Sequence, residues 1–149
     1  MTSATRIAIC FGLLLAASTA AFADLAQAKA EQNLEKRSKL ALENADNALK
    51  SARQAYEKGE IQQTRDLVAE LWESVDLAET SLKETGKDPR RSPKWFKRAE
   101  IGLRDLLKKL DAFEREMSVD DREMLAGTIA RVRGVHERLL LGLMEGKSK

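Results

Sequence analysis

Cysteine, proline and aromatic residues are all scarce in this chain. Its 149 residues include one cysteine and two prolines, and aromatic side chains make up 5%. The single cysteine, Cys10, excludes an internal disulfide framework. The fold must therefore be stabilised by a packed apolar core, and the chain is long enough to form one. Both prolines lie close together, at positions 89 and 93, and we expect a loop at residues 87–91.

Long apolar runs are also rare, and the one present is short. It extends from Ile7 to Ala17, whereas a helix that crosses a bilayer takes about 20 residues. Arg6 precedes the run, and Ala21-Phe22-Ala23 supplies the small-x-small pattern that signal peptidase cleaves. We therefore expect residues 1–23 to be a secretory signal peptide. The mature domain, 24–149, is expected in the periplasm or outside the cell, with no transmembrane segment.

Charge of neither sign is in large excess. The chain has 26 basic and 24 acidic residues, and loss of Arg6 with the signal peptide leaves a net charge of +1. A strong net charge is typical of proteins that bind nucleic acid or anionic membranes through their overall field. The composition therefore predicts no nucleic-acid partner and no obligatory membrane partner.

What the mature chain does have is helical periodicity. Apolar residues recur at alternating spacings of three and four in four segments, 34–56, 61–82, 96–117 and 125–143. Each predicted helix has one apolar face that it cannot bury alone. Short connections between long helices make successive helices antiparallel. We therefore expect one all-α domain, an antiparallel up-down-up-down four-helix bundle.

Turn residues mark the ends of these helices. Gly59 and Gly86 follow the first two segments, where a helix-terminating glycine is expected. Ser92-Pro93 is typical of an N-cap followed by proline at the first helical position. Ser118 to Asp121 forms a variant capping box before the fourth segment. Residues 24–30 are expected to fray.

One short stretch, Ala55 to Glu60, resembles the turn of a tetratricopeptide hairpin. That repeat recurs about every 34 residues, and no matching stretch follows one period later. The second predicted helix also continues beyond the length that such a repeat allows. We therefore predict an ordinary helical hairpin.

The only histidine, His136, does not belong to a recognisable catalytic, haem or metal pattern. Residues 24–58 contain no methionine to act as the second haem ligand of a b-type bundle cytochrome, and Cys-x-x-Cys-His is absent. A di-iron site needs glutamate three residues before the histidine, where Arg133 stands. No Gly-x-Ser-x-Gly turn is present. We predict no enzymatic activity, cofactor or metal, and a partly buried His136 with one nitrogen reaching water or a partner.

Charge is uneven between neighbouring segments. Residues 60–84 have a net charge of −5 and residues 86–116 of +4, and most of this difference can pair within a hairpin. One cluster has more positive charge than such pairing accounts for. We name it the basic tip, and it consists of Lys87, Arg90, Arg91, Lys94, Trp95, Lys97 and Arg98. Cations with aromatic neighbours are typical of a surface that binds an anionic partner. In the alternative interpretation, Trp95 and Phe96 anchor the third helix and the cations are merely solvated.

The fourth predicted helix has two glycines on its outward face. Gly127 and Gly134 lie opposite the core stripe, with Leu141 on the same line. Small residues seven apart let a second helix approach closely, so this helix is the candidate face of a homo-oligomer. An unconstrained surface explains the glycines as well.

Two segments, Thr85 to Glu100 and Met117 to Arg122, are similar to small exported helical proteins of bacteria that have no assigned function. The similarity covers the C-terminal half of the chain. It implies an exported helical fold and no activity.

Three functions are compatible with these features. We expect first an exported, non-enzymatic interaction protein of the periplasm or cell envelope, which uses the basic tip to hold a protein or an anionic envelope component. The first alternative is a carrier of a small ligand or cofactor with a site inside the bundle near His136. The second is an amphipathic protein that opens its bundle on a lipid surface.

Overall fold

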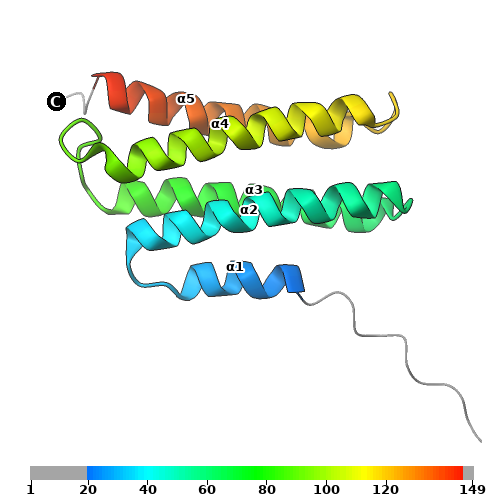
Figure 1. Cartoon of the computed structure of the whole chain (residues 1–149), viewed down its shortest axis with the longest axis horizontal. Coiled ribbons are helices and arrows are strands. Elements are labelled where there is room, and N and C mark those ends of the chain that lie inside the picture. The colour runs from blue at the N-terminus through cyan, green and yellow to red at the C-terminus, as the bar shows by residue number, and fades with distance from the viewer. Residues whose placement is uncertain (1–19, 146–149) are drawn as a thin grey trace, which may run out of the picture.

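The computed structural model describes residues 20–145, and this part of the chain is helical and contains no strand (Figure 1). The five helices are α1 (Ala20–Ala30), α2 (Leu34–Glu57), α3 (Ile61–Glu84), α4 (Pro93–Glu116) and α5 (Glu123–Glu145). The all-helical prediction is confirmed, and α2 to α5 correspond to the four helices expected from apolar periodicity. Most of the predicted signal peptide, up to residue 19, lies outside the described residues.

The helices pair into two antiparallel hairpins that stack on each other. α2 and α3 form one hairpin, and α4 and α5 form the other. In Figure 1, α2 and α4 run in one direction, whereas α1, α3 and α5 run in the opposite one. α2 packs against α4 and α3 packs against α5, so each lies beside a helix of its own direction. Helical repeat proteins stack their hairpins in this way.

The prediction gave the directions of successive helices but not which helices would be neighbours. An up-down-up-down bundle that closes in sequence order brings its last helix against its first. Here α5 packs against α3 and α4 but, over their described lengths, not against α2. Short loops dictate the direction of successive helices, and those directions are as predicted. They do not dictate which face of one hairpin meets the other.

Alanine lines the seam between α2 and α3. Five alanines of α2 are buried: Ala41, Ala45, Ala48, Ala52 and Ala55. Small side chains let two helix backbones approach closely, and α2 and α3 form the most extensive helix pair of the structure. The two helices of the first hairpin are therefore closely packed against each other.

Larger side chains fill the second hairpin and its contact with the first. The large buried residues of α4 and α5 are Phe96, Leu103, Leu106, Leu110, Phe113, Leu125, Ile129, Val132, Val135 and Leu139. They form one cluster with Ala45, Ala48, Ala52 and Ala55 of α2 and with Leu71 and Val75 of α3. The apolar stripes identified in the sequence thus meet in a common core.

A short helix covers the outer face of the first hairpin. Leu25 and Ala28 of α1 are buried, and Ala28 packs with Ala41 of α2 and Ala78 of α3. The expected fraying of residues 24–30 is therefore wrong. Two apolar residues three apart are too few to establish a helical period in a sequence, although they are enough to hold one turn of helix against a hairpin.

The predicted turn residues stand just after the C-terminal ends of α2 and α3 and just before the N-terminal end of α4. Gly59 and Gly86 have φ angles of 76° and 66°, the left-handed conformation that glycine adopts readily after a helix. α4 begins directly after Ser92, but the Ser92 side chain makes no capping hydrogen bond.

The predicted capping box before α5 is not formed. Ser118 Oγ donates to Asp121 Oδ2 at 2.7 Å, and α5 begins later, at Glu123. The hydroxyl of Tyr56 also donates to Asp121 Oδ2, at 2.9 Å, and accepts from the backbone N–H of Ser118 at 3.0 Å. Tyr56 belongs to α2, so these residues tie the α4–α5 loop to the first hairpin instead of capping α5.

Candidate functional site

The basic tip lies at one end of the stack, where the α3–α4 loop leads into α4 (left in Figure 1). Asp88 shapes this loop, because its Oδ1 accepts from the backbone N–H of Arg90 at 2.8 Å and its carbonyl accepts from the N–H of Ser92 at 2.9 Å. Pro89 lies against Gly142 of α5, where an added β-carbon would be 3.4 Å from the proline ring. The loop is therefore held between the ends of the helices.

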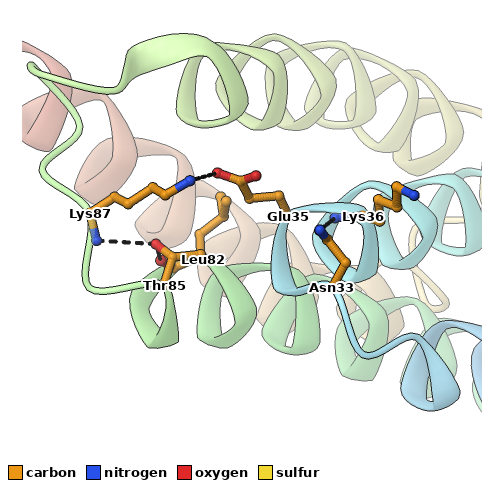
Figure 2. Close-up of polar contacts among 6 residues, drawn as sticks. All are labelled: Asn33, Glu35, Lys36, Leu82, Thr85 and Lys87. Carbon is orange, nitrogen blue, oxygen red and sulfur yellow. Dashed lines mark hydrogen bonds and ion pairs between the residues drawn. The ribbon is translucent and has the colours of Figure 1, made fainter.

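Lys87 differs from the other cations of the basic tip because it has an acidic partner. Its Nζ lies 2.6 Å from Oε1 of Glu35 in the first turn of α2 (Figure 2). Its backbone N–H donates to Thr85 Oγ1 at 3.2 Å. The ion pair joins the start of α2 to the loop, so Lys87 contributes less positive charge to a partner than the sequence implies.

The other five cations of the basic tip, from Arg90 to Arg98, have no carboxylate within 4.0 Å among residues 25–145. All five are exposed. Lys94 Nζ and Arg98 Cζ lie 5.4 and 5.2 Å from the centroid of the Trp95 ring, which is cation–π distance. The structure thus brings Lys94, Trp95 and Arg98 into direct contact and leaves their charges available.

The two aromatic residues at the start of α4 have different positions. Phe96 is buried in the common core. Trp95 is half-buried and packs against that core from its edge. Phe96 is thus an anchor of α4, whereas Trp95 combines anchoring with a ring face that is shared with cations.

A groove of about 470 Å³ opens beside Trp95, between the first turns of α2 and α4. Its lining residues are Glu35, Lys87, Ser92, Pro93, Lys94, Trp95 and Lys97. Of its three lysines, Lys87 is paired to Glu35, while Lys94 and Lys97 have no acidic partner in the described chain. An anionic group that enters this groove meets two free ammonium groups and an aromatic ring.

The start of α4 adds positive potential of its own. A helix N-terminus has a partial positive charge, and acidic side chains in the first turn usually offset it. The first turn of α4 contains no acidic residue. Lys94 and Lys97 therefore add to the helix dipole. This arrangement is unfavourable in the free protein and becomes favourable when negative charge is bound.

A second groove, of about 610 Å³, lies between α2 and α4; it includes Arg98 of the basic tip, but its Lys109 and Asp46 are paired with each other. Lys109 donates to Asp46, and Lys50 Nζ lies 3.0 Å from the same carboxylate. Burial raises the pKa of Asp46, but hydrogen bonds and charge from Lys109 and Lys50 outweigh it and hold the pKa below its ordinary value. This groove is therefore a weaker candidate for an anionic partner.

His136 is partly buried, as predicted, and its Nε2 lies 2.8 Å from Oε1 of Glu100 on α4. Arg104 Nη1 lies 3.7 Å from the same oxygen. Within the described residues, no three or more histidine, cysteine, aspartate or glutamate side chains are grouped to hold a metal ion. None of the helices between residues 20 and 145 is both long enough and apolar enough to span a bilayer.

Sequence reasoning missed a buried polar cluster between α2 and α3. Asn44 Nδ2 donates to Glu70 Oε1 at 3.0 Å and to Ser74 Oγ at 2.8 Å, and all three residues are buried. Within residues 20–145, Asn44 Oδ1 and Glu70 Oε2 have no hydrogen-bond partner. The residue spacing could have indicated this cluster, because Asn44 follows the buried Ala41 by three residues and Glu70 follows the buried Leu67 by three. Residues so spaced share a helix face.

Comparison with known proteins gives no relative: no family model, no curated protein and no solved structure matches this chain. Its function is therefore inferred from the arrangement of its own residues.

Proposed function

We propose that this chain is an exported, non-enzymatic interaction protein of the periplasm or cell envelope, and that it binds an anionic partner through the basic tip. The observation that supports this most directly is unpaired charge, since the basic residues from Arg90 to Arg98 lack a carboxylate partner in the described chain. Some cations elsewhere, such as Arg53, Lys109 and Arg138, pair with an acid of another helix; the basic tip is distinguished by the number of unpaired cations gathered within residues 90–98.

In this proposal the four long helices act as a four-helix bundle that holds the basic tip in place, and residues 1–23 are removed on export. Cleavage before Asp24 retains Leu25 and Ala28, the buried residues through which α1 contacts the first hairpin. The cover of that hairpin is thus compatible with removal of the signal peptide. Sites on packed helices are more precisely positioned than sites on loops alone.

The proposal is tested with polyphosphate as a soluble anionic probe and with two matched variants. The tip variant combines Arg90→Gln, Arg91→Gln, Lys94→Gln and Lys97→Gln. These side chains are exposed, and exposed substitutions usually change stability by less than about 0.5 kcal/mol each. We expect the tip variant to fold normally and to lose most of its affinity for polyphosphate. Wild-type binding should weaken as salt screens the charges.

The control removes the same charge from the opposite end of the stack. The far-end variant combines Lys58→Gln, Arg65→Gln, Arg115→Gln and Arg122→Gln, all at exposed positions. We expect it to bind polyphosphate like the wild type. Equal losses in both variants would mean that only net charge matters, and unchanged binding of the tip variant would exclude the basic tip as the site.

Export has a separate test. The intact mass of the protein recovered from the periplasm of a bacterial host should correspond to a chain that begins at Asp24. A mass that retains residues 1–23 would contradict the exported part of the proposal, without bearing on the binding surface.

A further inference from the structure

Large exposed apolar side chains are confined to the second hairpin and its loop. Among residues 25–145 they are Ile101, Val119, Leu140, Leu141 and Met144. Three of the five belong to the last turns of α5, where Leu140, Leu141 and Met144 are 39%, 51% and 68% exposed. We name these three residues the apolar ridge.

The apolar ridge lies at the same end of the molecule as the basic tip. α4 and α5 are antiparallel, and His136 of α5 lies beside Glu100 of α4. The ridge begins one turn beyond His136 along α5, and is therefore level with the first turns of α4. Gly142, within the ridge segment, contacts Pro89 of the α3–α4 loop.

Helical geometry places Lys97 between the two groups of residues. Residues three apart share a side of a helix, and Glu100, three residues after Lys97, faces α5 through its contact with His136. Lys97, which lines the groove beside Trp95, thus also stands at a helix position that borders α5. Ile101, four residues after Lys97 and 46% exposed, extends the same face. Through Lys97, the basic tip thus borders the apolar ridge at this end of the molecule.

Cations beside exposed apolar side chains are the composition of a surface that binds membranes peripherally. The cations attract anionic headgroups, and the apolar side chains enter the boundary between headgroups and acyl chains. A soluble polyanion would use the same cations but would offer no apolar environment to Leu141 and Met144. The observed combination therefore favours lipid over a soluble polymer.

We propose that this end of the molecule binds the surface of a bilayer that contains anionic lipids, with the basic tip on the headgroups and the apolar ridge in the outer acyl region. This inference rests on the proposed function, because both use the basic tip, and it identifies the partner as lipid. The helices do not have to separate, because both groups of side chains are already exposed.

The test uses flotation of the full mature protein with two kinds of vesicle, phosphatidylcholine alone and phosphatidylcholine mixed with an equal amount of phosphatidylglycerol. Polyphosphate binding is measured in parallel. The ridge variant combines Leu141→Ser and Met144→Ser. Its control is Val119→Ser, which removes a side chain that is 77% exposed in the α4–α5 loop, at the far end of the stack.

Wild-type protein should float with the anionic vesicles and not with the neutral ones. The tip variant should lose both vesicle and polyphosphate binding, since each cation near an anionic surface contributes about fivefold in affinity. The ridge variant should lose about tenfold or more in vesicle binding, because apolar burial is removed, and should keep its polyphosphate binding. Val119→Ser should behave like the wild type in both assays.

Two results would overturn the lipid inference. A ridge variant that binds anionic vesicles like the wild type, while polyphosphate binding still depends on the basic tip, would leave the proposed function and remove lipid as the partner. A lipid-free dimer that becomes a monomer in the ridge variant would assign the apolar ridge to a second copy of the chain. Loss of the tip dependence in both assays would instead contradict the proposed function itself.

Discussion

The two hairpins have helices of nearly equal length but differ in packing, cover and charge. The first combines the five buried alanines of α2 with larger core residues, most of them on α3, is covered on its outside by α1, and includes the acidic segment 60–84. The second is packed through large residues, includes the basic segment 86–116, and exposes every large apolar side chain found exposed among residues 25–145.

This difference bears on which hairpin the proposed partner would contact. A stack of hairpins needs a polar or covering element at each end to remain soluble, and α1 supplies such cover to the first hairpin. The second hairpin has no helix beyond it in the described chain, and it has unpaired cations instead. The uncovered, basic hairpin is therefore the side on which a partner is expected.

The largest expected effect concerns the core of the second hairpin. Leu106 is buried in α4, and truncation of a buried leucine leaves a cavity that costs about 2–5 kcal/mol. We expect Leu106→Ala to lower the free energy of unfolding by that amount in denaturant titration. Ile101→Ala, on the exposed face of the same helix, is the control and should have an effect within about 0.5 kcal/mol. Similar effects at both positions would show that the α4 core stripe is wrongly placed.

The first hairpin should respond to enlargement of its small residues. Ala48 is buried in the close α2–α3 seam, and extra methylene groups in a packed core usually cost about 1–3 kcal/mol. Ala48→Leu should lower the unfolding free energy by that amount, whereas Ala69→Leu, at an exposed position of α3, should have little effect. Tolerance of leucine at position 48 would contradict the distinction between the two hairpins.

A smaller loss of stability is expected at an ion pair that joins the two hairpins. Arg138 of α5 donates to both oxygens of Glu79 of α3, at 2.7 and 3.0 Å, and Lys83 lies 2.8 Å from one of them. Burial raises the pKa of Glu79, but the hydrogen bonds and charges of Arg138 and Lys83 outweigh it, so the pKa lies below its ordinary value of 4.5.

A lowered carboxylate pKa means that the contribution of Glu79 to stability is present above its unfolded pKa and is lost as pH falls through its folded pKa. Arg138→Gln should cost about 1 kcal/mol at neutral pH, because the arginine is half exposed and the pair is partly screened. The difference from wild type should shrink in acid. A difference that stays constant from neutral pH into acid would mean that Glu79 is not the partner through which Arg138 acts.

The smallest effect should be a gain in stability, whereas the substitutions described above lower stability. α2 begins with Glu35 in its first turn and α5 with Glu123, whereas α4 has no acidic residue there. Lys94→Glu should therefore raise the melting temperature, since an acidic side chain at a helix start contributes about 0.3–1 kcal/mol. The same change should weaken anion binding. Lower stability would show that Lys94 is already neutralised in the free protein.

Helices and core were predictable because both depend on residues close in sequence. A period of 3.6 residues identified four helices, and the stripe of α4 from Phe96 to Met117 is buried at every predicted position. Glycine conformation is equally local, and Gly59 and Gly86 mark helix ends as expected.

What the sequence did not reveal depends on residues far apart. The pairing of Lys87 with Glu35 joins positions 52 residues apart, so the sequence could not separate this lysine from the free cations of the basic tip. The stacking of the hairpins depends on contacts of α2 with α4 and of α3 with α5, which loop length does not determine. Leu141 was predicted to face outward, but its position beside the basic tip follows only from the antiparallel contact of α4 with α5.

The most direct test compares the two tryptophans, one in each hairpin. Trp95 lies in the basic tip, whereas Trp72 lies on α3 with Arg131 5.4 Å from its ring centroid. Single-tryptophan proteins are obtained with Trp72→Phe, which keeps Trp95, and Trp95→Phe, which keeps Trp72.

Fluorescence of each protein is recorded as vesicles containing phosphatidylglycerol are added. Emission of Trp95 should shift to shorter wavelength and become protected from an aqueous quencher, and added salt should reverse both changes. Emission of Trp72 should not change. A response from Trp72 without one from Trp95 would show that the partner meets the first hairpin, which would contradict the assignment of the binding surface to the start of α4.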